Sequence, residues 1–353
     1  AVFVMLFPML LLSLAWAQAH GFISARAVML WSKAIMQVDG PASFNSTDAF
    51  FPPLPFVLSI ALQWITGGTE VPIPFLLSAG LGAWLLVMWY DNLRTNGGIS
   101  VLTCCLALVL LALNPFFLRV LAEGPEAVLT LIGTWIFARG IVNLRLSGNA
   151  PDMMKVAVGL LIVSLSNSYG LLIGLGALPF MVVAARPSML VASPIGYLFA
   201  MFYPVVAAIL SMAFISSVFD SVLVPLLTEE PVPISMQNHL VILALNSVWH
   251  VESDPTLALA PMLAVLVVAI RFWPALALRE PIVVALLALG VALGVVSLRA
   301  NPVSETRNWV AAMQGDIIGD HAATRDLAAF LEDKDGIMVD VERNPEIVPQ
   351  IDD

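Results

Sequence analysis

Two carboxylates, Asp39 and Asp48, lie in a turn-rich segment between the first two long apolar runs of the chain. A carboxylate within hydrogen-bond reach of a hydroxyl can act as its general base. Aspartate beside Gly, Pro and Asn, as in the sequences DGP and NSTD here, is also a common turn former. Asp39 and Asp48 are therefore candidates for chemistry, with turn formation as the alternative.

The composition places these carboxylates in a membrane protein. Of the 353 residues, 60% are hydrophobic and 11% are charged, whereas a soluble domain is about half apolar and a quarter charged. The formal net charge is −10, and residues 301–353 contain twelve acidic and four basic side chains. This acidic balance excludes a nucleic-acid partner, because binding a phosphate backbone requires a basic surface.

A helix of about 20 apolar residues spans a bilayer. The chain contains several apolar runs of about this length, which predict an all-α, polytopic membrane bundle. The long run 153–185 has the turn-forming sequence NSYG at its centre, which predicts a reversal between two short spans. We expect residues 1–17 to form the first span, and a signal peptide is the alternative for that run. The prediction is about nine transmembrane helices, the others at 72–90, 100–118, 126–144, 189–218, 257–272 and 281–298.

The loop over residues 20–68 is unusually long for a connector. Residues 20–36 alternate apolar and polar side chains in a way that predicts an amphipathic helix on the membrane surface. Residues 53–65 are apolar but too short to cross comfortably, which predicts a second interfacial helix. The polar residues of this loop are thus expected to lie between surface helices.

The distribution of basic residues predicts the orientation. If loop 20–68 lies outside, seven Arg and Lys residues fall on the inner side and four on the outer side. We therefore expect a bundle over 1–299 in a bacterial inner membrane and an acidic, extracytoplasmic tail over 300–353. Within the tail, residues 321–331 predict an amphipathic helix and 336–341 a strand, a small α/β unit that needs a surface to pack on.

Two short motifs resemble a known family. The acids Asp39 and Asp48 followed by the sequence PPL at 52–54, and the sequence NPFFLR at 114–119 followed by GPE at 124–126, are similar to elements of the GT-C superfamily of polytopic glycosyltransferases. The protein mannosyltransferases and the lipid A aminoarabinose transferases belong to that superfamily. The layout of residues 1–300 is similar throughout, and the specific motifs lie between 39 and 126. The acidic pair common in the family's first loop, Asp followed at once by Glu, is absent.

The resemblance implies that a sugar is transferred from a polyprenyl-phosphate carrier to an acceptor at the outer face. Asp48, with Asp39 second, would then be the general base. The leaving lipid phosphate would be stabilised by cations, and Glu123 and Glu126, with His239 and His250, would be available for an acceptor or a divalent ion. The candidate cations are Arg26, Lys33, Arg119 and Arg299, each of which can alternatively extend to lipid headgroups.

No cofactor is implied, and two histidines eleven residues apart are weak support for a divalent metal. The alternative to an enzyme is a non-catalytic GT-C-like membrane subunit of a larger complex, since a fold does not guarantee its usual activity. Membrane lipids, a lipid-linked sugar and membrane protein partners are the expected contacts. A transporter has the least support, because the spans contain almost no ionisable residues.

Overall fold

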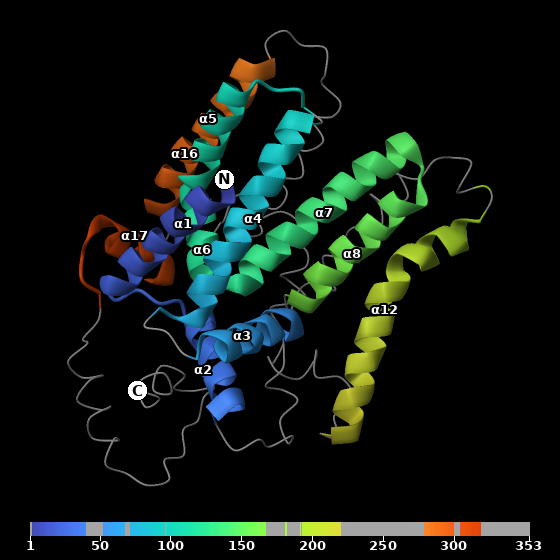
Figure 1. Ribbon diagram of the computed structural model, residues 1–353, viewed down its shortest axis with the longest axis horizontal. Coiled ribbons are helices and arrows are strands. Elements are labelled where there is room, and N and C mark those ends of the chain that lie inside the picture. The colour runs from blue at the N-terminus through green and yellow to red at the C-terminus, as the bar shows by residue number, and fades with distance from the viewer. Residues whose placement is uncertain are drawn as a thin grey trace.

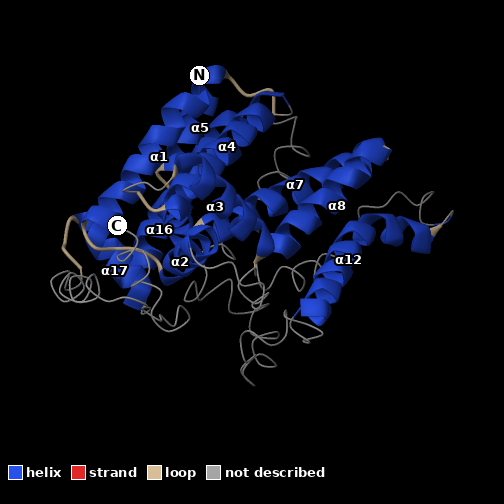
Figure 2. Ribbon diagram, turned by 60° about the horizontal axis from the view of Figure 1, so that its bottom comes forward, coloured by secondary structure: helices blue, strands red, loops and turns tan. Residues whose placement is uncertain are grey.

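The structure is a computed structural model that describes residues 2–39, 52–67, 71–95, 97–166, 193–219, 279–299 and 304–318, with Met181 and Val191. All regular secondary structure in these ranges is helical (Figure 2). Helices α1 (Val2–Ala19), α4 (Ile73–Thr95) and α7 (Pro125–Ser147) are long and apolar enough to cross a membrane. The bent pair α5 (Val101–Ala112) and α6 (Pro115–Glu123) would form a fourth span. The chain is therefore a helical membrane protein, and the described helices do not confirm the predicted count of nine.

The other helices surround these spans. They are α2 (Ala25–Asp39), α3 (Pro53–Thr66), α8 (Ala150–Ser166), α12 (Pro194–Phe219), α16 (Arg279–Arg299) and α17 (Ser304–Gln314). In Figure 1, α4 lies among α1, α5 and α7, with α16 beside α5, α8 beside α7 and α12 outermost. The ring centroids of the buried Trp89 on α4 and Trp135 on α7 lie 6.4 Å apart, and both side chains belong to the main apolar core.

The span predicted over 100–118 is not one continuous helix, because the chain bends by 55° between α5 and α6. Pro115 has no N–H to continue the helical hydrogen bonds of α5, and its ring would clash with the preceding turn. Asn114 caps the new helix instead, its Oδ1 accepting a 2.9 Å hydrogen bond from the Phe116 N–H. α6 therefore begins as a separate helix with its own direction.

The predicted loop helices are both present. The amphipathic helix predicted at 20–36 is α2, which begins only at Ala25 because Gly21, at a φ of 86°, forms a turn. The helix predicted at 53–65 is α3. The reversal at NSYG, the span 257–272, and the tail helix and strand at 321–331 and 336–341 lie outside the described residues. Helix α17 was not predicted.

Two polar contacts place the helix ends relative to one another. Glu280, in the first turn of α16, accepts hydrogen bonds of 2.9 Å from the Ser100 N–H and 2.7 Å from the Thr103 hydroxyl at the start of α5. The Ile318 N–H, just after α17, donates a 2.9 Å hydrogen bond to the His20 carbonyl at the end of α1. We call the end with α2, the last turn of α6 and α17 the site end, and the end with Glu280 the opposite end.

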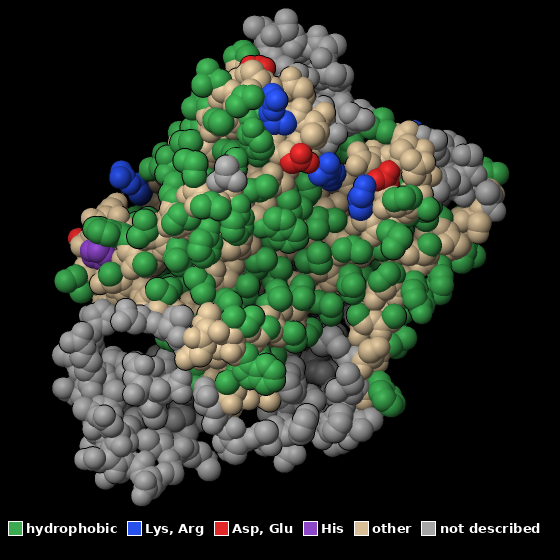
Figure 3. Space-filling model, viewed as in Figure 1, with side chains coloured by type: hydrophobic (Ala, Val, Ile, Leu, Met, Phe, Trp, Pro, Cys, Tyr) green, Lys and Arg blue, Asp and Glu red, His purple; other side chains and the backbone are tan. Residues whose placement is uncertain are grey.

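The surface between the two ends is largely apolar. Figure 3 shows hydrophobic side chains over much of the face in view, with the Lys, Arg, Asp and Glu side chains mainly near one end of the helices. On α12, the exposed Ile195, Phe199 and Leu210 lie on one side of the helix. Such a surface fits a hydrocarbon environment, in which exposed apolar side chains carry no cost.

Glycines bring α7 and α8 into close contact. A Cβ atom added at Gly159 would lie 2.6 Å from the Phe137 nitrogen and 2.8 Å from the Gly133 carbonyl oxygen. Both neighbours are backbone atoms of α7, so they cannot move away as a flexible side chain could. Small residues of this kind let transmembrane helices approach closely, which is a main source of their packing energy.

We expect Gly159→Ala to lower the free energy of unfolding by about 1–3 kcal/mol, the usual cost of overpacking. The matched control is Gly80→Ala on α4, where the nearest atom to an added Cβ is Phe7 Cε2 at 3.8 Å. That variant should be as stable as the wild type or more so, since alanine is the better helix former. Denaturant unfolding in micelles measures both, and equal stability of the two variants would contradict the close packing of α7 on α8.

Candidate functional site

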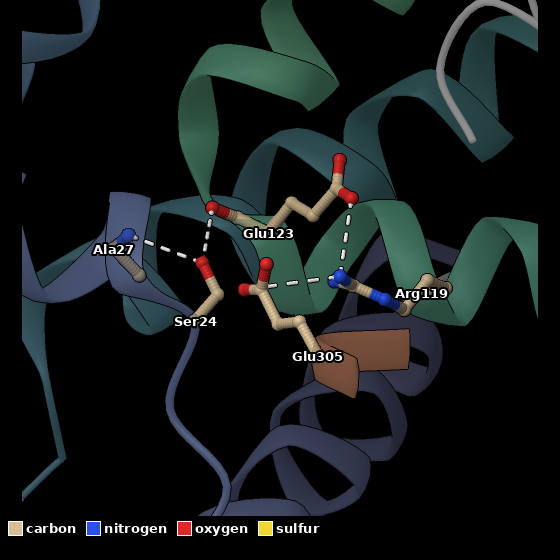
Figure 4. A network of polar contacts seen from close by, with 5 residues as sticks. All are labelled: Ser24, Ala27, Arg119, Glu123 and Glu305. Atoms are coloured by element: carbon tan, nitrogen blue, oxygen red, sulfur yellow. Dashed lines mark hydrogen bonds and ion pairs between the residues drawn. The ribbon is translucent and has the colours of Figure 1, made fainter. Parts of the chain in front are cut away.

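A buried arginine lies at the site end. Arg119 occupies the middle of α6, and only 2% of the residue is exposed. Its Nη2 is 3.3 Å from Oε1 of Glu123, one turn further along the same helix, and 3.8 Å from Oε1 of Glu305 in the first turn of α17 (Figure 4). The site thus contains one cation and two carboxylates. Arg119 and Glu123 belong to the same helix, and Glu305 comes from a segment far away in the sequence.

Ser24 attaches α2 to this cluster. Its hydroxyl accepts a 3.2 Å hydrogen bond from the Ala27 N–H, which caps α2, and donates a 3.0 Å hydrogen bond to the backbone carbonyl of Glu123. Gly124 follows with a φ of 119°, a conformation that favours glycine. A Cβ atom added at Gly124 would lie 3.7 Å from the Cα and Cβ atoms of Ala27. Pro125 then starts α7, so one short segment ends α6, receives α2 and begins the next span.

The environment of Arg119 leaves part of its binding capacity unused. The guanidinium lies over the Phe22 ring at 5.6 Å from the ring centroid, a favourable cation–π contact. Its Nε and Nη1 are buried and have no hydrogen-bond partner in the structure. A buried donor without a partner is costly, and more so when it is charged. These donors could bind an oxyanion.

Of the residues predicted from the sequence, Arg119 and Glu123 are brought into direct contact. Glu126, half-buried in the first turn of α7, follows Glu123 by three residues. Arg26 is exposed in the first turn of α2 and Arg299 is exposed at the end of α16.

The remaining predicted residues are less informative. Lys33 is half-buried on α2, and Asp39 is the last residue of that helix. Asp48, His239 and His250 lie outside the described residues. Among the residues that are described, no group of three or more His, Cys, Asp or Glu side chains could hold a metal ion.

Three contributors to the site were not predicted: Glu305, Ser24 and Phe22. Ser24 could have been found, since a serine just before an amphipathic segment is a typical helix cap. Glu305 was counted only as part of the acidic tail. An acidic residue such as Glu305 is typical of the first turn of a helix, so the start of α17 could have been predicted. Nothing in the sequence indicates that this helix contacts α6.

A second polar cluster lies at the opposite end, in the turn between α7 and α8. The Asp152 carboxylate accepts hydrogen bonds from the Ser147 hydroxyl and, at 2.9 Å, from Lys155 Nζ. Partial burial raises the pKa of Asp152, but the hydrogen bonds from Lys155 and Ser147, with the charges of Lys155 and Arg139, outweigh it and hold the pKa below its ordinary value of 3.8. Each oxygen of this carboxylate has a donor, which is the pattern of a structural turn.

We expect Ser24→Ala to lower the free energy of unfolding by about 0.5–2 kcal/mol, the usual effect of losing a helix cap. The control is Ser13→Ala, because the Ser13 hydroxyl bonds only to the Leu10 carbonyl of its own helix, at 2.7 Å. Denaturant unfolding of both variants in micelles measures the difference. Equal losses at the two positions would contradict the role of Ser24 in joining α2 to α6.

We expect the contribution of Asp152 to stability to depend on pH. Because its pKa in the folded protein is lower than in the unfolded chain, the stabilisation is complete above about 3.8 and is lost as the pH falls through the lowered folded value. Asp152→Asn should therefore be less stable than the wild type at pH 7, and the gap should narrow below pH 4. Thermal unfolding across this range tests it, and a gap that does not change with pH would contradict the assignment.

Comparison of the chain with protein-family models, curated proteins and solved structures finds no match.

Proposed function

We propose that the protein is a membrane glycosyltransferase that moves a sugar from a polyprenyl-phosphate donor to an acceptor at the outer face. The observation that carries this proposal is the buried guanidinium of Arg119, which retains donors on Nε and Nη1 without partners. Arginine is well suited to the oxygens of a phosphate group, because its planar fork offers several charged N–H donors at once.

The donor chemistry explains why a cation is needed at this place. When the glycosidic bond breaks, negative charge develops on the leaving lipid phosphate, and a fixed cation in a water-poor environment stabilises it strongly. Arg26 and Arg299 are exposed at the same end of the bundle as Arg119. These two cations are suited to attract an anionic headgroup along the membrane surface.

The acceptor requires a base. In this proposal Asp48 takes the proton of the acceptor hydroxyl, with Asp39 as the second candidate. Lys33 contributes positive charge from α2, and Glu123 and Glu126 orient the acceptor from the α6–α7 junction. No metal ion or cofactor enters the proposed reaction.

The proposal includes a topology. The bundle over 1–299 has about nine spans in a bacterial inner membrane, and the acidic tail over 300–353 lies on the outer side. Support comes from the basic residues, since Arg94 and Arg145 lie in the last turns of α4 and α7, at the end opposite to the site.

A second candidate function is a non-catalytic GT-C-like subunit of a larger membrane complex. The observation in its favour is that Arg119 already has two carboxylates, those of Glu123 and Glu305, as counter-charges within the protein. A cluster of this kind can simply attach α17 to α6, as a structural ion-pair network does. If the protein is a transferase, substitution of the predicted base or of Arg119 removes turnover. If it is a non-catalytic subunit, substitution of Arg119 lowers only the stability.

We expect the purified protein in nanodiscs to release sugar from polyprenyl-phosphate donors, and Asp48→Asn to reduce kcat by about 10²- to 10⁴-fold, the usual contribution of a general base. Asp39→Asn serves as the comparison within the same loop. Arg119→Lys, which keeps the charge but loses the fork, should reduce turnover more than Arg299→Gln at the exposed end of α16. Absence of turnover with every donor, with membrane proteins co-purifying, would favour the subunit instead.

A further inference from the structure

The two carboxylates on Arg119 are held very differently. Glu123 belongs to the same helix, lies 3.3 Å away and has 6% of its side chain exposed. Glu305 comes from α17, lies 3.8 Å away and has 42% of its side chain exposed. An ion pair with a well-exposed partner contributes little to stability, because water and salt compete for it. Glu305 is therefore the partner that can leave.

Departure of Glu305 does not require α17 to move. The helix is fixed further along by the buried Trp309 and Ala312, and beyond its end by the hydrogen bond from the Ile318 N–H to the His20 carbonyl. Glu305 precedes Trp309 by four residues, in the first turn of the helix. The Glu305 side chain reaches from α17 to one side of the Arg119 guanidinium, which its departure would free (Figure 4).

The charge balance favours exchange of one anion for another. Arg119 and Glu123 together are neutral, so Glu305 adds one negative charge to the cluster. An incoming phosphate oxygen would restore the contact with Nη2, and a second phosphate oxygen could accept from either Nε or Nη1, which Glu305 leaves without partners. A single carboxylate at 3.8 Å uses less of the guanidinium than a phosphate group can.

We propose that Glu305 is a displaceable internal counter-ion that occupies Arg119 until the phosphate group of a polyprenyl lipid replaces it. This inference rests on the proposed function, in which Arg119 binds the lipid phosphate. It assigns α17 a regulatory role. The contact between Arg119 and Glu305 must be broken before the phosphate binds, and this cost weakens the binding. The resting site is closed by the protein's own carboxylate.

The test is equilibrium binding of farnesyl phosphate to the full chain in phosphatidylcholine nanodiscs. Glu305→Gln removes the charge and keeps the shape, and should tighten binding by about two- to fivefold, the range over which an exposed ion pair competes. Asp316→Asn is the matched control: it removes one exposed carboxylate just after α17, with the same change in net charge. Its affinity should equal that of the wild type.

Two further measurements locate the effect at Arg119. Arg119→Gln should weaken binding by about tenfold or more, as expected for losing hydrogen bonds to a charged group, and adding Glu305→Gln to it should then change nothing. Farnesol, which lacks the phosphate, should not respond to Glu305→Gln. Inorganic phosphate that binds as well as farnesyl phosphate would show that the ligand is a free phosphate and would overturn the assignment to a lipid.

The counter-ion role is overturned if Glu305→Gln leaves the affinity unchanged or weakens it, or if Asp316→Asn tightens it equally. In those cases weaker binding by Arg119→Gln would still support phosphate chemistry at Arg119. If neither the wild type nor Glu305→Gln binds farnesyl phosphate, both the counter-ion role and the proposed function fail. Tighter binding by Glu305→Gln without any sugar release would keep the counter-ion role and refute the transferase.

Discussion

A guanidinium that is almost completely removed from solvent must find its counter-charge within the protein, because taking an ion out of water costs several kcal/mol even after relaxation. At Arg119 this constraint involves three parts of the chain. α6 supplies Glu123 one turn away, α17 supplies Glu305, and Ser24, the residue just before α2, donates a hydrogen bond to the carbonyl of Glu123. The arrangement of the site end follows from satisfying this one cation, since each of these helices makes a polar contact with the cluster or with the backbone that carries it.

The cation can occupy this place only because two breaks isolate α6 from the spans on either side. Asn114 and Pro115 end the direction of α5, and Gly124 with Pro125 ends α6 before α7 begins. A continuous helix would carry Arg119 onward along the axis of α5. The 55° bend gives the nine-residue helix a different direction, and Arg119 there meets Glu305 of α17. The helix breaks at Pro115 and Gly124 thus determine which side chains can contact Arg119.

The sequence predicted the helical membrane class, the amphipathic helix α2 and the short helix α3. It also offered Arg119 and Glu123 as separate candidates, one for the lipid phosphate and one for the acceptor, but not their contact. Periodicity and composition carry this information locally. The bend at 113–114 was missed because the apolar run 100–118 gives no hydropathy signal for a change of direction. Glu305 was missed for a different reason: its contact depends on how Trp309 packs on the bundle, and tertiary packing between segments almost 200 residues apart leaves no trace in local pattern.

The charged side chains at the two ends of the bundle differ in how many of their hydrogen-bonding atoms have partners. This difference is a structural reason to look for function at the site end. At the opposite end, Glu280 accepts from Ser100 and Thr103, and Asp152 accepts from Ser147 and Lys155. Those carboxylates fasten helix termini and turns, and their hydrogen bonds account for their presence. At the site end, Arg119 is more deeply buried and yet keeps donors on Nε and Nη1 without a partner. Among the described residues, Arg119 is the charged member of the buried groups that keep unpaired donors, and an anionic ligand is the partner that would use them.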